Sequence, residues 1–131
     1  MTSEIIRKLQ ILVVDDDPDL CEVVERCLNG KGYEATAVHR GVDAVACLET
    51  VAYDLILLDI NLPRLSGPQV LDYLQGLVNP PPVLMMSGAT ETEIKEDVVR
   101  RGARAFLAKP FTPERLLAAV ERVLSNPKSS D

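Results

Sequence analysis

The sequence predicts an α/β fold in which strand and helix alternate five times, a doubly wound (βα)5 arrangement around a five-stranded parallel sheet. Two observations predict it. First, four short hydrophobic runs are almost free of charge, which is typical of parallel strands covered on both faces. They are residues 9–14, 55–58, 83–86 and 105–108. Second, segments with helical spacing of apolar residues separate these runs, and no long loop intervenes.

The first half of the chain has clear start and stop signals. Asp17 and Pro18 are typical of the N-cap and first position of a helix, and Gly30 and Gly32 are expected to end it. The apolar positions of this helix are Leu20, Val23, Val24, Cys27 and Leu28. Residues 33–39 alternate loosely and predict a weaker, more exposed strand. The helix after it is expected to carry its apolar side on Val42, Val45, Ala46 and Leu48.

In the second half, a loop of residues 60–68 leads to a helix that carries Val70, Leu71 and Leu74. Asn79 and the three prolines after it exclude helix and predict a stiff, extended entry into the next strand. Residues 91–101 predict the most weakly amphipathic helix, with only Ile94, Val98 and Val99 to bury. Thr112 and Pro113 predict the cap and start of the last helix. Its apolar positions are Leu116, Leu117, Val120, Val123 and Leu124.

Polar residues follow four of the expected strands. Right-handed crossovers, and a weak second strand that suits an edge, favour the strand order 2-1-3-4-5. Ligands of such sheets bind beyond the carboxyl ends of the strands, where the winding direction switches. The residues at that edge are Asp15, Asp16 and Asp17, then Asp59, Ser87 and Lys109. One aspartate after a strand is most often a turn former or a helix cap. All four positions together predict a functional site.

Composition limits the classes of function. The 131 residues suffice for one domain that folds without metals or disulfides. A net charge of −6 argues against a surface for nucleic acid, which needs clustered lysine and arginine. The three cysteines, Cys21, Cys27 and Cys47, lack any paired spacing and indicate a reducing compartment. The first ten residues resemble neither a signal peptide nor a membrane span, so the expected location is the cytoplasm.

The acidic cluster indicates the chemistry. Carboxylates forced into one crevice repel one another until they take up protons or a cation neutralises them. Oxygen ligands favour a hard cation, and Mg²⁺ is the usual choice where one or two carboxylates join a phosphate. A metal, an ammonium group from Lys109 and the Ser87 hydroxyl around one carboxylate suit phosphoryl transfer, because its transition state spreads negative charge over several oxygens. Asp59, expected at the centre, is the best nucleophile.

Four strings in the sequence resemble a known family. ILVVDDDP, LILLDINLPRLSG, VLMMSGAT and AFLAKPF, in this order and spacing, closely resemble the receiver (CheY-like) domain of two-component response regulators, from about Leu9 to Leu124. The resemblance implies a flavodoxin-like fold. It also implies that a sensor histidine kinase or a histidine phosphotransfer protein donates a phosphoryl group to an aspartate with the help of Mg²⁺. Self-phosphorylation and self-dephosphorylation are expected from the family, without the turnover of an enzyme.

The resemblance also implies a role for each site residue. Asp59 is the phosphoacceptor, Asp16 a direct metal ligand, Asp15 a ligand largely through water, and Asn61 a ligand through its backbone carbonyl. Ser87 binds the phosphoryl group and moves inward on activation, and Lys109 pairs with the phosphoryl oxygens. Phe106 takes the place of the aromatic switch residue, and Pro110 is commonly cis. Two departures are Ser66 before Gly67, where many receivers have Asp-Gly, and the absence of an acidic pair at Arg104 and Ala105.

Other readings remain open at this point. A receiver-like binding module that takes no phosphate shares the same fold. A haloacid-dehalogenase-type phosphatase would use Asp15 as its nucleophile and Asp17 beside it, but it needs a further acidic pair after the lysine. A dinucleotide-binding domain is excluded because no glycine-rich loop follows the first strand. His39, near the end of the edge strand, is expected to be exposed.

The expected domain organisation is simple. Residues 1–8 are an N-terminal extension, residues 9–125 the receiver domain, and residues 126–131 a tail or the start of a linker. The expected output is a changed surface, presented to an output protein or domain, that is centred on residues 91–101, the strand bearing Phe106 and the last helix.

Overall fold

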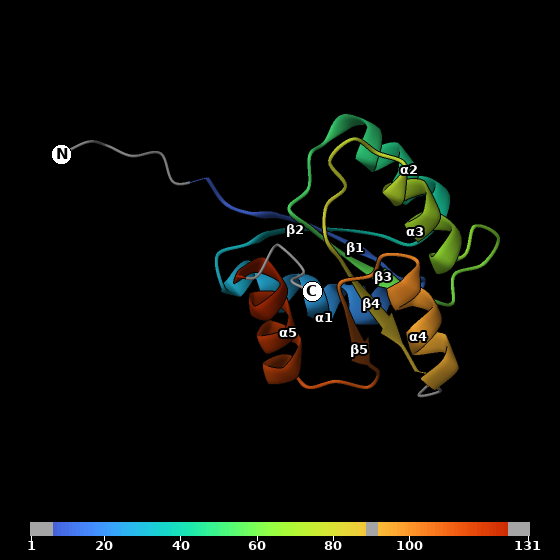
Figure 1. Cartoon of the computed structure of the whole chain (residues 1–131). Coiled ribbons are helices and arrows are strands. Elements are labelled where there is room, and N and C mark those ends of the chain that lie inside the picture. Colours follow the sequence, from blue (N-terminus) through green and yellow to red (C-terminus); the bar gives the residue numbers. More distant parts are fainter. Residues whose placement is uncertain (1–6, 89–91, 126–131) are drawn as a thin grey trace.

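The computed structural model, which describes residues 7–88 and 92–125, has one five-stranded parallel sheet (Figure 1). The order β2-β1-β3-β4-β5 confirms the prediction, with the weak strand β2 at one edge. The strands are β1 (Gln10–Val14), β2 (Glu34–Val38), β3 (Leu55–Asp59), β4 (Val83–Ser87) and β5 (Ala105–Ala108). Strands β1, β3 and β4 are buried almost throughout, as expected for strands covered on both faces.

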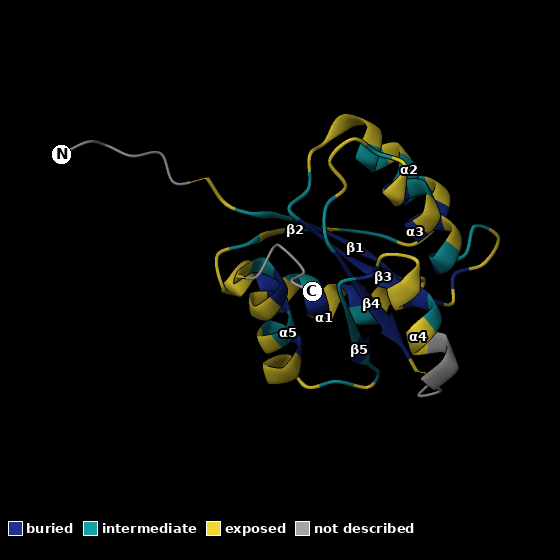
Figure 2. Ribbon diagram, in the orientation of Figure 1, coloured by how far each residue is buried: buried dark blue, intermediate teal, exposed yellow. Residues whose placement is uncertain are grey.

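Helices cover both faces of this sheet (Figure 2). They are α1 (Pro18–Gly30), α2 (Gly41–Thr50), α3 (Gly67–Gln75), α4 (Thr92–Arg100) and α5 (Pro113–Ser125). Successive side chains of a strand point to opposite faces, so Leu12 and Ile56 pack with α2, α3 and α4, while Ile11 and Leu55 pack with α1 and α5. The sheet thus separates two hydrophobic cores.

The cap residues explain where three helices begin. The Asp17 carboxylate accepts hydrogen bonds from the backbone N–H groups of Asp19 and Leu20, which confirms it as the N-cap of α1. The Thr112 hydroxyl accepts from the N–H of Arg115 at the start of α5. Ser66 and Gln69 form a reciprocal capping box at the start of α3. This box was not predicted, although the Ser-x-x-Gln spacing is its usual signature.

Several apolar residues assigned to buried helix faces are exposed instead. Val23, Val42 and Val99 are 53%, 52% and 50% exposed, and Ala46 is also exposed. The cause is that only a narrow row of residues on each helix contacts the sheet. In α2, only Gly41 and Ala44 are buried, because Gly41 packs tightly on the loop before α3. Val98 of α4 is buried as predicted, whereas the side chain of Ile94 lies outside the described residues.

The strand register brings the polar residues to one edge. Val14 pairs with Leu58, Asp59 with Met86, and Ser87 with Ala108. The residues that follow β1 and β5, and those that end β3 and β4, therefore lie on the same side of the molecule, next to the switch point between β1 and β3. No helix in the described part of the chain is both long and apolar enough to cross a membrane.

Candidate functional site

Three carboxylates converge beyond the ends of β1 and β3. Asp15, Asp16 and Asp59 each place one carboxylate oxygen within 4.8 Å of the other two. Asp15 and Asp59 are buried and Asp16 is exposed. The two buried carboxylates belong to neighbouring strands, and Asp16 faces solvent beside them. The predicted juxtaposition is confirmed, and it offers an all-oxygen donor set with an open side, which suits a hard divalent cation.

Lys109 reaches this cluster from the end of β5. Its Nζ lies 2.6 Å from Oδ2 of Asp15 and 3.5 Å from Oδ1 of Asp59. The ammonium group therefore bridges the two buried carboxylates and neutralises part of their charge. The Lys109–Pro110 peptide bond is cis.

Ser87, Asn61 and Phe106 are the three other residues to which the resemblance assigns a role. Ser87 is fully buried at the end of β4, and its carbonyl oxygen accepts a hydrogen bond from the Lys109 N–H. The Asn61 N–H donates to Oδ1 of Asp59, so the loop after β3 turns directly over the carboxylate. Phe106 on β5 pairs in register with Met85 on β4 and is half-buried against the core on the α2, α3 and α4 side of the sheet.

The electrostatics of the cluster are unbalanced without a metal. Burial first, and then the charge of Asp15, raise the pKa of Asp59 to about 6, although Lys109 acts in the opposite direction. Burial disfavours the charged form of Lys109, but the hydrogen bond to Asp15 and the nearby negative charge of Asp59 outweigh it and raise the pKa of this amine. Burial and the neighbouring carboxylates thus disfavour the charged form of Asp59, and a bound cation would relieve this cost.

Two residues missed as site residues hold the backbone of Asp15. His39 is exposed as predicted, yet its Nδ1 lies 3.1 Å from the Asp15 carbonyl oxygen. The Cys21 thiol donates to the same oxygen over 3.3 Å. Burial, followed by the charge of Asp15, raises the pKa of Cys21 to about 12, so the thiol keeps its proton. No spacing rule predicts the contact with His39, which is 24 residues from Asp15.

Gly67 is a second feature that the sequence pattern did not reveal. A Cβ atom at this position would collide with the backbone carbonyl oxygen of Asp59, and the Gly67 N–H donates to the carbonyl of Ile60. The start of α3 is therefore pressed against the strand that ends in Asp59. Ser66, which stands where many receivers have Asp, is the N-cap of that helix.

Comparison of the sequence with known proteins identifies response regulators as its relatives. The family model for the response regulator receiver domain matches residues 11–121. The chain is 30% identical to the transcriptional regulatory protein ZraR of Salmonella typhimurium over 123 residues, which cover 94% of this chain and 28% of that protein. It is 33% identical to the response regulator MprA of Mycobacterium tuberculosis over 123 residues, which cover 94% and 54%. The chain thus spans about half, or less, of these relatives.

Solved structures support the same family. The chemotaxis response regulator CheY4 of Vibrio cholerae has a TM-score of 0.85 and 31% identity, covering 90% of this chain and 100% of that one. The receiver domain of NtrX from Brucella abortus has a TM-score of 0.82 and 37% identity, covering 88% and 98%. The chain belongs to the receiver domain family of two-component response regulators, and is therefore a CheY-like signalling domain.

Proposed function

We propose that Asp59 accepts a phosphoryl group from the phosphohistidine of a sensor histidine kinase or a histidine phosphotransfer protein. The observation that carries this proposal is the position of Asp59: its buried carboxylate lies in the cluster with Asp15 and Asp16 and 3.5 Å from the Lys109 ammonium. A nucleophile surrounded by cation-binding groups suits a reaction in which charge spreads over phosphoryl oxygens.

Receiver domains generally bind Mg²⁺ at an acidic pocket, and the donor set here fits that ion. Asp15, Asp16 and Asp59 would hold it together with the backbone carbonyl of Asn61. When bound, the ion neutralises the crowded carboxylates and the oxygens of the phosphoryl group. This chain's own residues then do the rest: an Asp59 oxygen attacks phosphorus, the phosphorus–nitrogen bond of the donor breaks, and the imidazole keeps the electron pair and takes up a proton.

Lys109 and Ser87 receive the transferred group. Lys109 already contacts Oδ1 of Asp59, so a phosphoryl group on that carboxylate would exchange part of the Lys109–Asp15 contact for a contact with phosphoryl oxygens. The Ser87 hydroxyl would donate to another of these oxygens. Small phosphodonors are expected to phosphorylate Asp59 as well, because the site itself supplies the groups that the reaction needs. For the same reason, water is expected to hydrolyse the acyl phosphate slowly without another protein.

A groove lies beside the cluster and shares Lys109 with it. It has a volume of about 510 Å³ and is lined by Asp17, Leu20, Gly88, Lys109, Pro110 and Phe111. Leu20 and Phe111 are its apolar lining residues, and Gly88 is exposed with open space where a side chain would begin. A donor protein can therefore bring an imidazole ring to the cluster between α1 and the loop after β5.

The phosphatase alternative conflicts with the role of Asp17. That mechanism needs a free carboxylate two residues after its nucleophile, whereas the Asp17 carboxylate caps α1. Trapping the acyl phosphate with borohydride and mapping the reduced peptide separates the two mechanisms. We expect the label on Asp59. Label on Asp15, together with turnover of external phosphomonoesters, would overturn the receiver mechanism.

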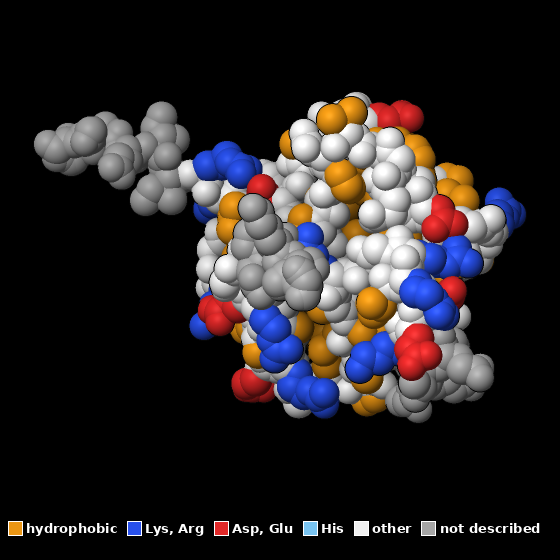
Figure 3. Space-filling view, viewed as in Figure 1, with side chains coloured by type: hydrophobic (Ala, Val, Ile, Leu, Met, Phe, Trp, Pro, Cys, Tyr) orange, Lys and Arg blue, Asp and Glu red, His pale blue; other side chains and the backbone are white. Residues whose placement is uncertain are grey.

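We also propose residues 9–125 as the functional unit and the cytoplasm as its location. The output would be a changed surface formed by α4, β5 and α5, presented to a separate protein or to a further domain. Figure 3 shows this face, on which Lys and Arg side chains lie around hydrophobic ones. An Arg101 side chain holds the end of α4 through ion pairs with Asp97 and with Asp72 of α3, over 3.1 and 2.8 Å. Because these pairs are exposed they contribute little stability, so a small shift of Ser87 and Phe106 can alter how α4 packs.

Replacing Ser87 with alanine is expected to separate phosphorylation from this output. Beryllofluoride, a mimic of the phosphoryl group, should change amide hydrogen exchange most in α4 and β5, because the contacts to Ser87 and Lys109 differ between the two states. In Ser87→Ala the change should be blunted while Asp59 is still phosphorylated. Exchange that changes only in the loops touching Asp59, in both proteins, would show that the output lies elsewhere.

A further inference from the structure

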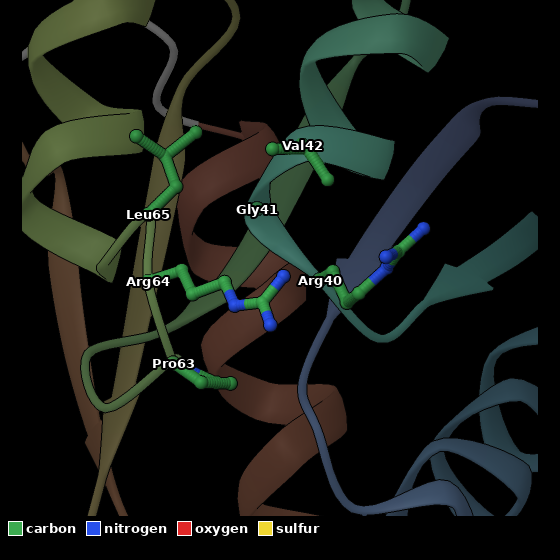
Figure 4. Close-up of a pocket in the computed structure, with 6 residues that line it drawn as sticks. All are labelled: Arg40, Gly41, Val42, Pro63, Arg64 and Leu65. Carbon is green, nitrogen blue, oxygen red and sulfur yellow. The ribbon is translucent and has the colours of Figure 1, made fainter.

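A second hollow lies on the other side of the phosphoacceptor strand, between the start of α2 and the loop that joins β3 to α3. It has a volume of about 330 Å³ and is lined by Arg40, Gly41 and Val42 on one side and by Pro63, Arg64 and Leu65 on the other (Figure 4). It shares no residue with the groove that Lys109 lines beside the carboxylate cluster. We call it the Arg64 hollow.

The walls of the Arg64 hollow are fixed by the fold. A Cβ atom on Gly41 would lie 2.5 Å from the Leu65 carbonyl oxygen, so only glycine lets the two segments approach this closely. The loop is tied down beyond the hollow as well, by the capping box of Ser66 and by the close contact between Gly67 and the backbone of Asp59. The hollow is therefore present before any ligand arrives, which reduces the entropic cost of binding.

Arg64 places an unsatisfied positive charge on this hollow. It is exposed, and within the described residues its guanidinium has neither an ion pair nor a hydrogen bond. Figure 4 shows the side chain extended from the loop toward the start of α2, with Arg40 directed away from it. Arg40 is instead bound to Asp43 over 2.9 and 3.0 Å. Arg64 thus remains the guanidinium here with free donors.

The backbone of Arg64 adds a second observation. Its φ angle is 66°, in the left-handed region that favours glycine and is costly for a residue with a long side chain. A turn residue such as glycine or asparagine would form this loop with less strain. Strain kept at one position points to a use for its side chain.

The remaining walls determine what kind of ligand fits. Val42, 52% exposed, faces the hollow together with Pro63 and Leu65, so the floor is aliphatic. The volume accommodates little more than one or two side chains. No aromatic ring lines it for stacking with a base, and the net charge of −6 opposes nucleic acid. A protein this acidic nevertheless presents a guanidinium here, which favours a carboxylate as the partner group.

We propose that the Arg64 hollow docks a short acidic segment of a partner protein. One carboxylate of the segment pairs with the Arg64 guanidinium, and a neighbouring aliphatic side chain packs between Val42, Pro63 and Leu65. The start of α2 reinforces this preference, because no side chain of its N-cap residue, Arg40, caps the backbone N–H groups of the first turn, and the positive end of the helix dipole faces the site. Since the two hollows are separate, such a partner and a phosphodonor can bind at the same time.

The test is a nuclear magnetic resonance titration of the full ¹⁵N-labelled chain. The protein is not phosphorylated, so the result does not depend on the proposed function. The probe is a capped tripeptide with leucine between two glutamates, and the control probe replaces both glutamates with glutamine. We expect saturable shifts of the amides of Gly41, Val42, Arg64 and Leu65 with the acidic probe, at a Kd on the order of millimolar, and about tenfold weaker binding of the neutral one.

Two variants decide the outcome. Arg64→Gly suits the left-handed backbone, so its melting temperature should not fall, while acidic-probe affinity should drop at least about tenfold. Arg115→Ala, which removes an exposed arginine on α5, should bind like wild type. Val42→Glu, a favourable residue in a first helical turn, should repel the probe. Shifts that persist in Arg64→Gly, that map elsewhere, or that fail to saturate up to about 10 mM would overturn the proposal.

Discussion

Replacing Asp16 with alanine is expected to lower the affinity for Mg²⁺ by more than about 100-fold and to abolish phosphorylation of Asp59. Asp16 is the exposed member of the carboxylate cluster, and in the proposed mechanism it is the direct ligand. The fold should survive, because Asp16 is exposed and its charge adds to the repulsion on Asp59. Calorimetric titration with Mg²⁺ and thermal melting of the metal-free protein measure the two effects.

The matched control for this change is Asp17→Asn. It removes the neighbouring negative charge, but asparagine still caps α1, because its side-chain oxygen can accept the hydrogen bonds from Asp19 and Leu20. Binding of Mg²⁺ should stay within a few-fold of wild type. Tight Mg²⁺ binding by Asp16→Ala, or an equal loss in both variants, would show that the assigned ligands are wrong.

Replacing Asp59 with asparagine is expected to stabilise the metal-free protein at pH 7 by about 3 kcal/mol, which corresponds to roughly 10 °C in melting temperature. The reason is the pKa of Asp59, which rises from 3.8 to about 6 in the folded state. Between these two values the folded protein binds more protons than the unfolded chain, so the free energy of unfolding falls as the pH rises through this window. Asparagine removes the burial and repulsion of the charge.

Melting curves in excess chelator between pH 4 and pH 8 test this effect. The gap between Asp59→Asn and wild type should be smallest at the acidic end, where Asp59 is protonated, and largest above about pH 6. Saturating Mg²⁺ should narrow the gap at pH 7, because the cation stabilises the charged carboxylates of wild type. A gap that is independent of pH would mean that Asp59 is not the strained group.

Much of this architecture could be predicted because short-range rules decide it. Continuous apolar runs, without alternation of polar residues, predict β1, β3 and β4, and an Asp-Pro pair predicts the start of α1. The cluster of Asp15, Asp16 and Asp59 follows from topology alone, because parallel strands with this order must end at one edge.

The features that could not be predicted depend on contacts between distant segments. The orientation of α2 is decided where Gly41 meets the loop before α3, so a helical-wheel argument misplaced Val42. The contact between His39 and the Asp15 carbonyl joins two strand ends whose side-chain geometry no spacing rule supplies. The left-handed conformation of Arg64 is similarly hidden, because a long charged residue carries no signal for it.

The most direct test of the account is intact-protein mass spectrometry after incubation with a small acyl phosphate or phosphoramidate. Wild type and Asp59→Asn are compared in Mg²⁺ and in excess chelator. The chelator removes the cation that the cluster of Asp15, Asp16 and Asp59 would bind. We predict that wild type gains the mass of one phosphoryl group only with Mg²⁺, and that Asp59→Asn gains none. A stable adduct on Asp59→Asn, or equal labelling of wild type in chelator, would contradict the assignment of Asp59 as the Mg²⁺-dependent phosphoacceptor.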